Sequence, residues 1–418
     1  MDLKKELTQV AQGAKKASEW LCALSSDAKN KALSEMAAAL IAKKDIIIKA
    51  NKKDIILAKR RGLSPAFIDR LTLNEKRILN MSESLRTLIG LSDPVGQVIK
   101  AWLQPNGLWI HKVRVPIGVI AIVYESRPNV TSDCIGLCFK SGNSVILRGG
   151  SDAINSNLCI YGILKEVIKK QGIPEGVVNM VTTKDRKALD VLLKLSGYID
   201  LVIPRGGEGL IQRVTKLSRI PVIKHYKGIC HVYVDEWADL NMAEKICFNA
   251  KVQRPGVCNA MESMLVHRDV AARFLPGMSN KFRQAGVQIR GCPVTQRIVR
   301  GVKPATEKDY RTEYLDLILS VKVVESVQEA IRHVNFYGSH HSDAIVTDNY
   351  ENALAFVKQV DSACVYVNAS TRFTDGYQFG LGAEIGISTD KLHARGPMAL
   401  EELTTYKYMV FGNGQIRT

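Results

Sequence analysis

One cysteine stands at a break between two predicted elements, where a thiol could act as a nucleophile. Cys258 follows the Pro255-Gly256 pair, which ends a helical pattern over residues 239–250, and an apolar strand-like run comes after it. A turn of this kind leaves backbone N–H groups unused, and such groups favour a thiolate and can hold an oxyanion. Lys251 and Arg254 would add positive charge that also favours the thiolate. The pattern therefore predicts a nucleophilic thiol; the alternative is that Cys258, one of nine cysteines, is an ordinary core residue.

Two glycine pairs follow apolar strand-like runs, and each has an arginine directly before it. Gly149-Gly150 comes after Arg148, and Gly206-Gly207 comes after Arg205. A glycine at the carboxyl end of a strand lets a ligand approach the backbone closely, and the helix N-terminus that follows favours anions. The pairs therefore predict a nucleotide site, although each would also suit an ordinary strand-to-helix turn. Neither the Gly-x-Gly-x-x-Gly fingerprint nor the Walker pattern occurs, so a conventional Rossmann or P-loop site is not expected.

Three further loops carry polar side chains that could contact a substrate. Arg127 and Asn129 open a predicted helix, where Asn129 is either a helix cap or an amide donor to a developing oxyanion. Arg372 lies in one loop near the C-terminus, and His393 and Arg395 lie in another. Loops of this composition can bind carboxylate or phosphate groups, or can simply be solvated.

The remaining cysteines and histidines do not predict a metal site. Cys134 and Cys138 share one face of a predicted helix, but no second pair stands at the spacing of a zinc site, so we interpret them as core residues. His340-His341 and His393 have no recognisable set of fellow ligands in the sequence. A serine nucleophile with its histidine and aspartate is also absent as a motif.

The elements that must position these residues alternate between strands and helices. Residues 2–92 show apolar residues at helical spacing and predict three helices, of which the second closes at Gly62 and the third opens at Ser64-Pro65. Residues 96–115 predict a hairpin around Asn-Gly. From residue 117 apolar runs alternate with helical patterns, and the alternation restarts at residue 229. Strands buried on both faces and joined by helices predict an α/β fold with two parallel sheets.

This organisation predicts three segments with different roles. Residues 1–228 would form the first α/β domain with its N-terminal helices and the hairpin, and residues 229–395 would form the second domain, which carries Cys258. Residues 396–418 would return to the first domain and end in one more strand. No long linker separates the two α/β parts.

Composition and charge limit the class of protein. The chain has 418 residues, 46% of them hydrophobic and 24% charged, as expected for a soluble globular protein of two or three domains. It has no apolar run long enough for a transmembrane helix, and its first residues are polar and helical, unlike a signal peptide. An odd number of cysteines suits a reducing cytoplasm. The net charge of +17 suits anionic substrates, and a solvated basic surface is favoured over nucleic-acid binding because few aromatic residues accompany the lysines.

Taken in order, the motifs form a pattern that resembles the aldehyde dehydrogenase superfamily and, within it, the gamma-glutamyl phosphate reductases. The resemblance covers nearly the whole chain. Each motif is weakly specific by itself, but the set in this order is strongly specific. The motifs are Val115–Val119, Glu125–Asn129, Ile203–Gly207, Gly228–Asp235, Gln253–Asn259, Val367–Gly376, Phe379–Glu384 and Leu392–Pro397.

The resemblance implies an aldehyde-dehydrogenase-like fold and a reaction. Cys258 would attack the acyl phosphate of L-gamma-glutamyl 5-phosphate, its own N–H and the Asn129 amide would hold the oxyanion, and phosphate would leave. NADPH would then reduce the thioester to L-glutamate 5-semialdehyde, the second step of proline biosynthesis from glutamate. The residues that match the family's cofactor contacts are Arg148, Gly149, Gly206, Gly207 and Glu313.

One departure from the wider family agrees with this chemistry. Hydrolytic aldehyde dehydrogenases carry a general-base glutamate before the strand that begins here near residue 229, whereas residues 221–228 contain no carboxylate. A base that activated water would waste the thioester by hydrolysis. The alternative is another phosphate- or CoA-dependent acylating aldehyde dehydrogenase.

The resemblance also implies partners. The candidates for substrate binding, as a group, are Arg127, Arg372, His393 and Arg395. The hairpin and the final strand match the family's oligomerisation element, which predicts a homodimer or homotetramer. We expect a small-molecule substrate, no metal, no nucleic acid and no membrane association. The glutamate 5-kinase that makes the labile acyl phosphate is a further candidate partner.

Overall fold

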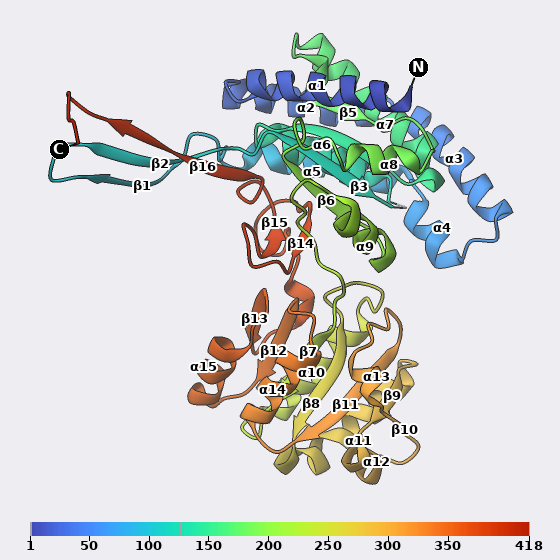
Figure 1. The fold of residues 1–418 in the computed structure, drawn as a ribbon. Coiled ribbons are helices and arrows are strands. Elements are labelled where there is room, and N and C mark those ends of the chain that lie inside the picture. The colour runs from blue at the N-terminus through green and yellow to red at the C-terminus, as the bar shows by residue number, and fades with distance from the viewer. Residues whose placement is uncertain (1, 126, 418) are drawn as a thin grey trace. The chain divides into compact units, whose positions relative to one another are not determined.

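The computed structural model describes residues 2–125 and 127–417, which form two compact units (Figure 1). The first unit comprises Met1–Lys224, Gly380–Gly386 and Met398–Thr418. The second comprises His225–Phe379 and Ile387–Pro397. The chain passes from the first unit to the second after Lys224 and crosses again after Phe379, Gly386 and Pro397.

Five helices, rather than the predicted three, precede the first strand. They are α1 (Leu3–Leu21), α2 (Ser26–Ala42), α3 (Lys44–Arg60), α4 (Pro65–Leu71) and α5 (Glu75–Gly90). The prediction of α4 from Ser64-Pro65 is confirmed: the Ser64 hydroxyl accepts the Phe67 N–H and Pro65 begins the helix. The prediction places one break before Gly62, whereas the structure has two there, after α1 and at Lys43, and a further break separates α4 from α5. None of these breaks contains proline or glycine, so hydrophobic spacing alone does not reveal them.

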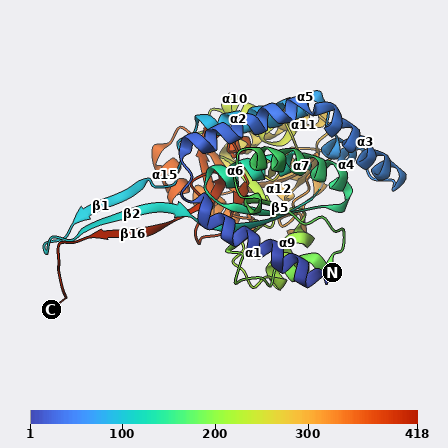
Figure 2. The same ribbon diagram turned by 90° about the horizontal axis from the view of Figure 1, so that it is seen from above.

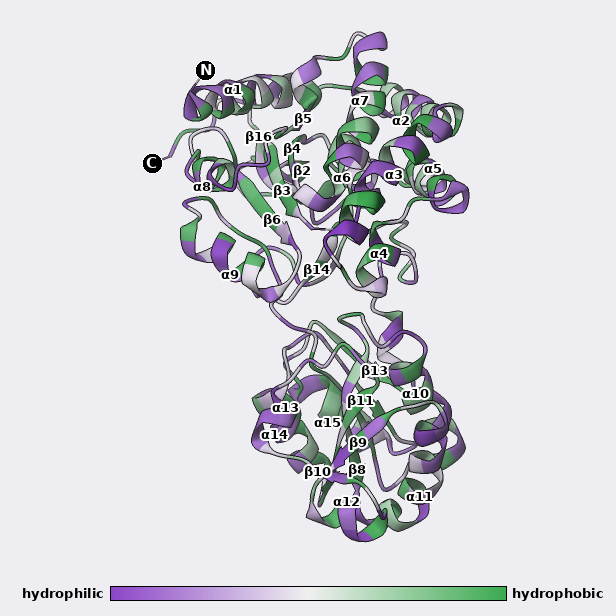
Figure 3. Cartoon of the chain, turned by 90° about the vertical axis from the view of Figure 1, so that its right-hand side faces the viewer, coloured by the Kyte–Doolittle hydropathy of each residue, from purple (hydrophilic) through white to green (hydrophobic). Residues whose placement is uncertain are grey.

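A four-stranded parallel sheet forms the core of the first unit, in the order β5-β4-β3-β6. Every residue of β3, Val-Ile-Ala-Ile-Val-Tyr, is buried, and Figure 3 colours this strand as hydrophobic. A strand with no polar face must be covered on both sides, which is the signature of a parallel sheet between helices. The strands are β3 (Val119–Tyr124), β4 (Ser144–Gly149), β5 (Val178–Met180) and β6 (Leu201–Arg205). The helices that join them are α6 (Asn129–Lys140), α7 (Ile154–Lys170), α8 (Lys187–Leu192) and α9 (Glu208–Leu217), with short 3-10 turns η1 (Ser151–Ala153) and η2 (Glu175–Val177).

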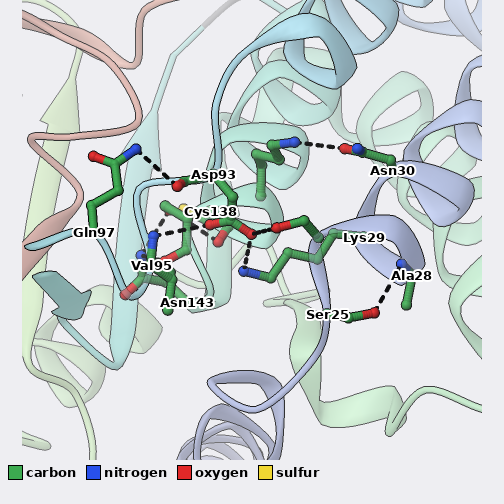
Figure 4. Close-up of polar contacts among 12 residues, drawn as sticks. Ser25, Ala28, Lys29, Asn30, Asp93, Val95, Gln97, Cys138 and Asn143 are labelled. Atoms are coloured by element: carbon green, nitrogen blue, oxygen red, sulfur yellow. Dashed lines mark hydrogen bonds and ion pairs between the residues drawn. The ribbon is translucent and has the colours of Figure 1, made fainter.

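A buried ion pair fastens the N-terminal helices of this unit to the chain that enters its hairpin (Figure 4). The Lys29 ammonium lies 2.8 Å from the Asp93 carboxylate, and both side chains are almost fully buried. The same carboxylate accepts the Val95 N–H at 3.0 Å, while the Gln97 amide donates to the Asp93 carbonyl at 2.9 Å. Because every polar group here has a partner, the contact fixes α2 against the segment after α5.

The predicted hairpin and final strand are confirmed as one antiparallel sheet in the order β1-β2-β16. Its strands are β1 (Val98–Leu103), β2 (Trp109–Pro116) and β16 (Thr404–Phe411). Figures 1 and 2 show this sheet extending away from the rest of its own unit. Several large apolar side chains on it are exposed, including Leu103, Trp109, Tyr408 and Phe411.

The second unit is built on a seven-stranded sheet in the order β10-β9-β11-β8-β7-β12-β13, with parallel pairing throughout. Its central strands β7 (Cys230–Val234), β8 (Met261–His267) and β12 (Ser342–Val346) are buried along their whole length. The other strands are β9 (Gln288–Gly291), β10 (Lys303–Pro304), β11 (Ile318–Val324) and β13 (Cys364–Val367). The helices are α10 (Leu240–Val252), α11 (Arg268–Gln284), α12 (Pro293–Ile298), α13 (Glu307–Tyr310), α14 (Val327–Tyr337) and α15 (Tyr350–Gln359), with η3 (Thr371–Phe373). Two short strands, β14 (Gly386–Ser388) and β15 (Gly396–Met398), pair with each other.

The prediction of an α/β fold with two parallel sheets and a small additional β element is therefore confirmed. Among the described residues, no helix is both long and apolar enough to cross a membrane.

Candidate active site

Cys258 lies in the short loop between α10 and β8, where the sequence places the nucleophile, and it is half-buried. The chain before β7 packs directly against this loop. A Cβ atom added to Gly228 would lie 1.9 Å from the Cys258 carbonyl oxygen, so only glycine can stand there. The Cys230 thiol, two residues later, donates to the same carbonyl at 3.2 Å. The backbone at Cys258 is therefore held in place by its contacts with Gly228 and Cys230.

Glu313 approaches the same loop through a backbone contact. The Gly228 N–H donates to Glu313 Oε1 at 2.9 Å. The segment that carries Glu313 is held in turn by Glu262 on β8, whose Oε1 accepts the Leu315 N–H at 3.0 Å. The hydrogen bond from Gly228 to Glu313 and the one from Leu315 to Glu262 together fix the Glu313 carboxylate near the cysteine loop.

Lys251 does not supply the positive charge beside the thiol that the sequence suggested. Its ammonium is buried and lies 2.7 Å from Glu262 Oε2, so its charge is neutralised by that carboxylate. Burial raises the pKa of Glu262 to about 7, against the opposing attraction of Lys251. Burial likewise lowers the pKa of Lys251. This pair is a structural element of the helix that leads to the loop.

Arg372 is the cation that comes near Cys258. Its Nε donates to Gln253 at 2.9 Å, and its guanidinium also donates to the side-chain oxygen of Asn259. Burial and the charge of Arg254 lower the pKa of Arg372, while the Cys258 sulfur raises it. Arg372 therefore ties the two sides of the cysteine loop together and keeps positive charge beside the sulfur.

Two histidines that the sequence did not identify converge on the thiol. One ring nitrogen of His225, one ring nitrogen of His341 and the Sγ of Cys258 all lie within 4.8 Å of one another. The two rings meet edge to face, with centroids 5.5 Å apart. His225 Nδ1 lies 2.8 Å from the Ile387 carbonyl oxygen. The expectation that His341 has no fellow ligand residues is therefore wrong, because three segments far apart in the chain meet here.

The other two C-terminal candidates lie in a loop of their own. The Arg395 guanidinium contacts Asp361, with Nη1 2.8 Å from Oδ1 and Nη2 2.9 Å from the backbone carbonyl. Lys391 and Arg395 together hold the pKa of Asp361 at about 2. His393 is exposed and has a positive φ of 69°. Arg395 thus has an anionic partner within the protein.

On the first unit, Asn129 is the first residue of α6, and Pro128 rather than Asn129 occupies the cap position. The interpretation of Asn129 as a helix cap is therefore wrong. Its side-chain N–H donates to Asp133 Oδ2 at 3.1 Å, one turn further along the helix. Burial raises the pKa of Asp133 to about 6, although the bond from Asn129 opposes this rise. Arg127 is half-buried and lies just before the helix.

A cavity of about 460 Å³ opens beside β4 on the same unit. Its lining includes the basic side chains Arg148, Lys184, Arg186 and Arg213 and the acidic side chains Glu125 and Asp152. Burial lowers the pKa of Arg148, and the charges of Arg186 and Arg213 lower it further. Arg213 is paired with Asp190 at 2.9 Å. Guanidinium groups close enough to repel one another favour an anionic ligand.

The predicted glycines contact protein atoms at the edge of this cavity. A Cβ on Gly149 would meet the Asn157 amide at 2.2 Å, and one on Gly206 would meet the Glu125 carboxylate at 2.4 Å. The Gly207 N–H donates to Glu125 at 2.9 Å. Arg148 lines the cavity, as do Gly150 and Gly209, the neighbours of the predicted glycines.

Comparisons with known proteins agree with the motifs. Residues 3–290 match the model of the aldehyde dehydrogenase family. A gamma-glutamyl phosphate reductase of Thermodesulfovibrio yellowstonii is 58% identical over 417 residues, which is 100% of both chains. One from Clostridium acetobutylicum is 56% identical over the same share of both chains.

Solved structures give the same result. The crystal structure of gamma-glutamyl phosphate reductase from Thermotoga maritima is 50% identical, with a TM-score of 0.97, covering 99% of this chain and 100% of that chain. An acetylating aldehyde dehydrogenase from Geobacillus thermoglucosidasius, at 16% identity and a TM-score of 0.70 over 100% of this chain and 98% of that chain, shares the fold. Aldehyde dehydrogenases use nicotinamide cofactors. The chain therefore belongs to the aldehyde dehydrogenase family and, within it, to the gamma-glutamyl phosphate reductases.

Proposed function

We propose that the protein reduces L-gamma-glutamyl 5-phosphate to L-glutamate 5-semialdehyde with NADPH and releases phosphate, the second step of proline biosynthesis. The observation that carries this proposal is the half-buried Cys258 in a loop clamped by Gly228 and Arg372, in a chain whose curated relatives of 53–58% identity carry that enzyme's name. An acyl phosphate needs a thiol nucleophile and a cation near the anionic leaving group, and both are present on the second unit.

The covalent step is the attack of the Cys258 sulfur on the acyl carbon. The carbon–sulfur bond forms, the bond from carbon to the phosphate oxygen breaks, and a thioester on Cys258 remains. Bound NADPH would supply the hydride that reduces this thioester. When the resulting oxyanion re-forms its carbonyl, the aldehyde leaves and the sulfur is regenerated.

Three groups are proposed to stabilise negative charge during these steps. The Cys258 N–H and the Asn129 amide would hold the oxyanion; one Asn129 N–H faces Asp133, and the amide has a second N–H to donate. Arg372 is the favoured contact for the phosphate or carboxylate of the substrate. Arg127 and His393 remain candidates, whereas the pairing of Arg395 with Asp361 favours a role in holding its loop.

The first unit is proposed to bind NADPH in the cavity beside Arg148. A 2′-phosphate there would relieve the repulsion among Arg148, Arg186 and Arg213. Gly149, Gly206 and Gly207 would form the turns around the cofactor, because a larger residue at Gly149 or Gly206 would clash with neighbouring side chains. Glu313, held by the Gly228 N–H, is proposed to bind the nicotinamide ribose.

The further assignments are proposals of the same kind. Residues 1–228 would form the NADP-binding domain, residues 229–395 the catalytic domain and residues 396–418 the return to an oligomerisation sheet. The exposed apolar side chains of β1, β2 and β16 support a homodimer or homotetramer. We further propose that the protein is cytoplasmic and that its reaction needs no metal. We also propose that it contacts the glutamate 5-kinase that supplies its substrate.

The reverse reaction tests the substrate. Purified protein is mixed with glutamate 5-semialdehyde and NADP⁺, and with either phosphate or coenzyme A, while NADPH absorbance is followed. We expect reduction of NADP⁺ that requires phosphate and stops in Cys258→Ser. Reduction that requires coenzyme A instead would favour the acyl-CoA alternative, and reduction without either would refute the acyl-phosphate chemistry.

A further inference from the structure

The loop around Cys258 contains a basic nitrogen that the proposed reaction has not yet used. As a thiol, Cys258 must lose a proton to attack, and the departing phosphate must gain one. A side chain that accepts the first proton and delivers the second would serve both needs. Imidazole is suited to this because it exchanges protons near neutral pH.

His225 has the right nitrogen available. Its Nδ1 lies 2.8 Å from the Ile387 carbonyl oxygen, which can only accept a hydrogen bond. In the neutral ring Nδ1 therefore carries the proton, and Nε2 carries the lone pair. One nitrogen of this ring, one nitrogen of the His341 ring and the Cys258 sulfur all lie within 4.8 Å of one another. A backbone carbonyl that fixes the tautomer is the usual device for orienting a working histidine.

The other ionisable groups near Cys258 are less suited to the task. Lys251 and Glu262 neutralise each other, and a guanidinium such as that of Arg372 holds no proton-accepting lone pair. Burial raises the pKa of the Cys230 thiol well above its ordinary value, so Cys230 keeps its proton. His341 is buried, and its Nδ1 lies 2.8 Å from the Ser342 hydroxyl.

The electrostatic surroundings of His225 are mixed. Its own segment carries Lys224, Tyr226, Lys227 and Cys230, and the Gly228 N–H of this segment donates to Glu313. Cys258 and His341 meet its ring, and Asp390 follows Ile387, whose carbonyl it contacts.

We propose that His225 is the proton-transfer residue of Cys258. As the sulfur–carbon bond forms, the Sγ proton passes to His225 Nε2, and the imidazolium then gives this proton to the oxygen of the departing phosphate. The charges balance, because the thiol proton becomes the proton of the released hydrogen phosphate. The second half of this sequence rests on the proposed function, whereas the removal of the thiol proton does not.

The test uses the free protein, so that it does not depend on the identity of the substrate. The rate of alkylation of Cys258 by iodoacetamide is measured between pH 6 and pH 10, with the modified peptide quantified by mass spectrometry. The variant is His225→Asn, whose amide can still donate to the Ile387 carbonyl but cannot accept a proton. The matched control is His340→Asn, because His340 Nδ1 also lies close to a backbone carbonyl, that of Asp361 at 2.6 Å.

We expect alkylation of Cys258 in His225→Asn to be slower by at least about tenfold near pH 7, with the difference disappearing toward pH 10, where hydroxide removes the proton. His340→Asn should keep the wild-type profile. A wild-type rate and pH profile in His225→Asn would overturn the proposal. His341→Asn provides a second comparison: if that variant alone loses the reactivity, the proton acceptor is His341 and the assignment to His225 is wrong.

Turnover adds a second readout. In His225→Ala, added imidazole should restore part of the activity with phosphate-dependent NADP⁺ reduction, while thermal melting and NADP⁺ binding stay as in the wild type. Alkylation of Cys258 could be slow in His225→Asn while neither the wild type nor any variant shows phosphate-dependent turnover. That result would uphold the removal of the thiol proton by His225 and reject the proposed substrate. Turnover in His225→Ala that equals the wild type without imidazole would reject His225.

Discussion

The loop around Cys258 and the cavity beside Arg148 are both basic, yet they handle charge differently. Around the loop, the charge of Lys251 is matched by Glu262, whereas Arg372 donates to the uncharged amides of Gln253 and Asn259. In the cavity, Arg148 lies among like charges that lower its pKa. The first arrangement holds the Arg372 cation in place beside the nucleophile with uncharged partners. The second becomes favourable when an anion enters.

The largest expected effect is on the reaction itself. Cys258→Ser should lower turnover by at least about 10³-fold, because a hydroxyl is a far weaker nucleophile than a thiol at this site. Binding of NADPH to the cavity should be unchanged, as measured by fluorescence titration. Loss of cofactor binding in this variant would show that the loop and the cavity are not separate in function.

Removing one partner of the buried Lys251–Glu262 ion pair should lower folding stability. Lys251→Met leaves the Glu262 carboxylate buried without its cation and should lower the free energy of unfolding by about 3–5 kcal/mol. Urea denaturation measures this change. The double variant Lys251→Met/Glu262→Gln removes both charges and should recover much of the loss; if it is no more stable than the single variant, the ion pair is not the cause.

The same pair predicts a pH dependence with a defined sign. The folded pKa of Glu262 is about 7, above its ordinary value of 4.5, so the folded state retains a proton that the unfolded state releases. Its contribution to stability is therefore full below pH 4.5 and is lost as the pH rises to about 7. Comparison of wild type with Glu262→Gln by urea denaturation across this interval isolates the contribution, and a slope of opposite sign would contradict it.

Removing one charge from the cavity should change cofactor choice. Arg148→Ala should raise the KM for NADPH by roughly 10- to 100-fold, the value of one charge-assisted hydrogen bond, and leave the KM for NADH nearly unchanged. Lys184→Ala is the matched control, because Lys184 lines the same cavity but is not one of the charges that lower the pKa of Arg148. Equal losses with both cofactors would show that Arg148 supports the fold rather than the 2′-phosphate.

The smallest effect should come from the loop that carries Arg395. Asp361→Asn weakens its contacts to Lys391 and Arg395 and should lower the melting temperature by a few degrees. Because the folded pKa of Asp361 is about 2, below its ordinary 3.8, its stabilising contribution is present above pH 3.8 and is lost toward pH 2. Thermal scans at pH 7 and pH 3 should therefore differ less in the variant; a loss of activity much larger than the loss of stability would give this loop a direct role.

Much of the fold could be predicted because its signals are local. A continuous apolar run such as β3 indicates a buried parallel strand, and Ser64-Pro65 indicates a helix start. One of the two breaks at Cys22 and Lys43, and the break between α4 and α5, could not be predicted because they contain neither proline nor glycine. Their positions depend on how α1, α2 and α3 pack.

The candidate site was predictable only in part, for a related reason. Cys258 could be identified from its position after Pro255-Gly256. His225 and His341 could not, since neither belongs to a short motif and only the meeting of three loops places them together. The role of Lys251 also depended on a partner one strand away, Glu262, which no local pattern links to it.

The pairing of β16 with β2 has a consequence for biosynthesis. During translation β2 emerges long before Thr404–Phe411, and at about 5–20 residues per second the delay is on the order of a quarter of a minute to a minute. Throughout that time the edge of β2 that will pair with β16 has unpaired backbone N–H and C=O groups, and other nascent chains can form β-sheet hydrogen bonds with it. Lys112 and Arg114 lie on β2, where their charges oppose pairing with other chains. The yield of native protein should therefore depend on how quickly the last strand arrives.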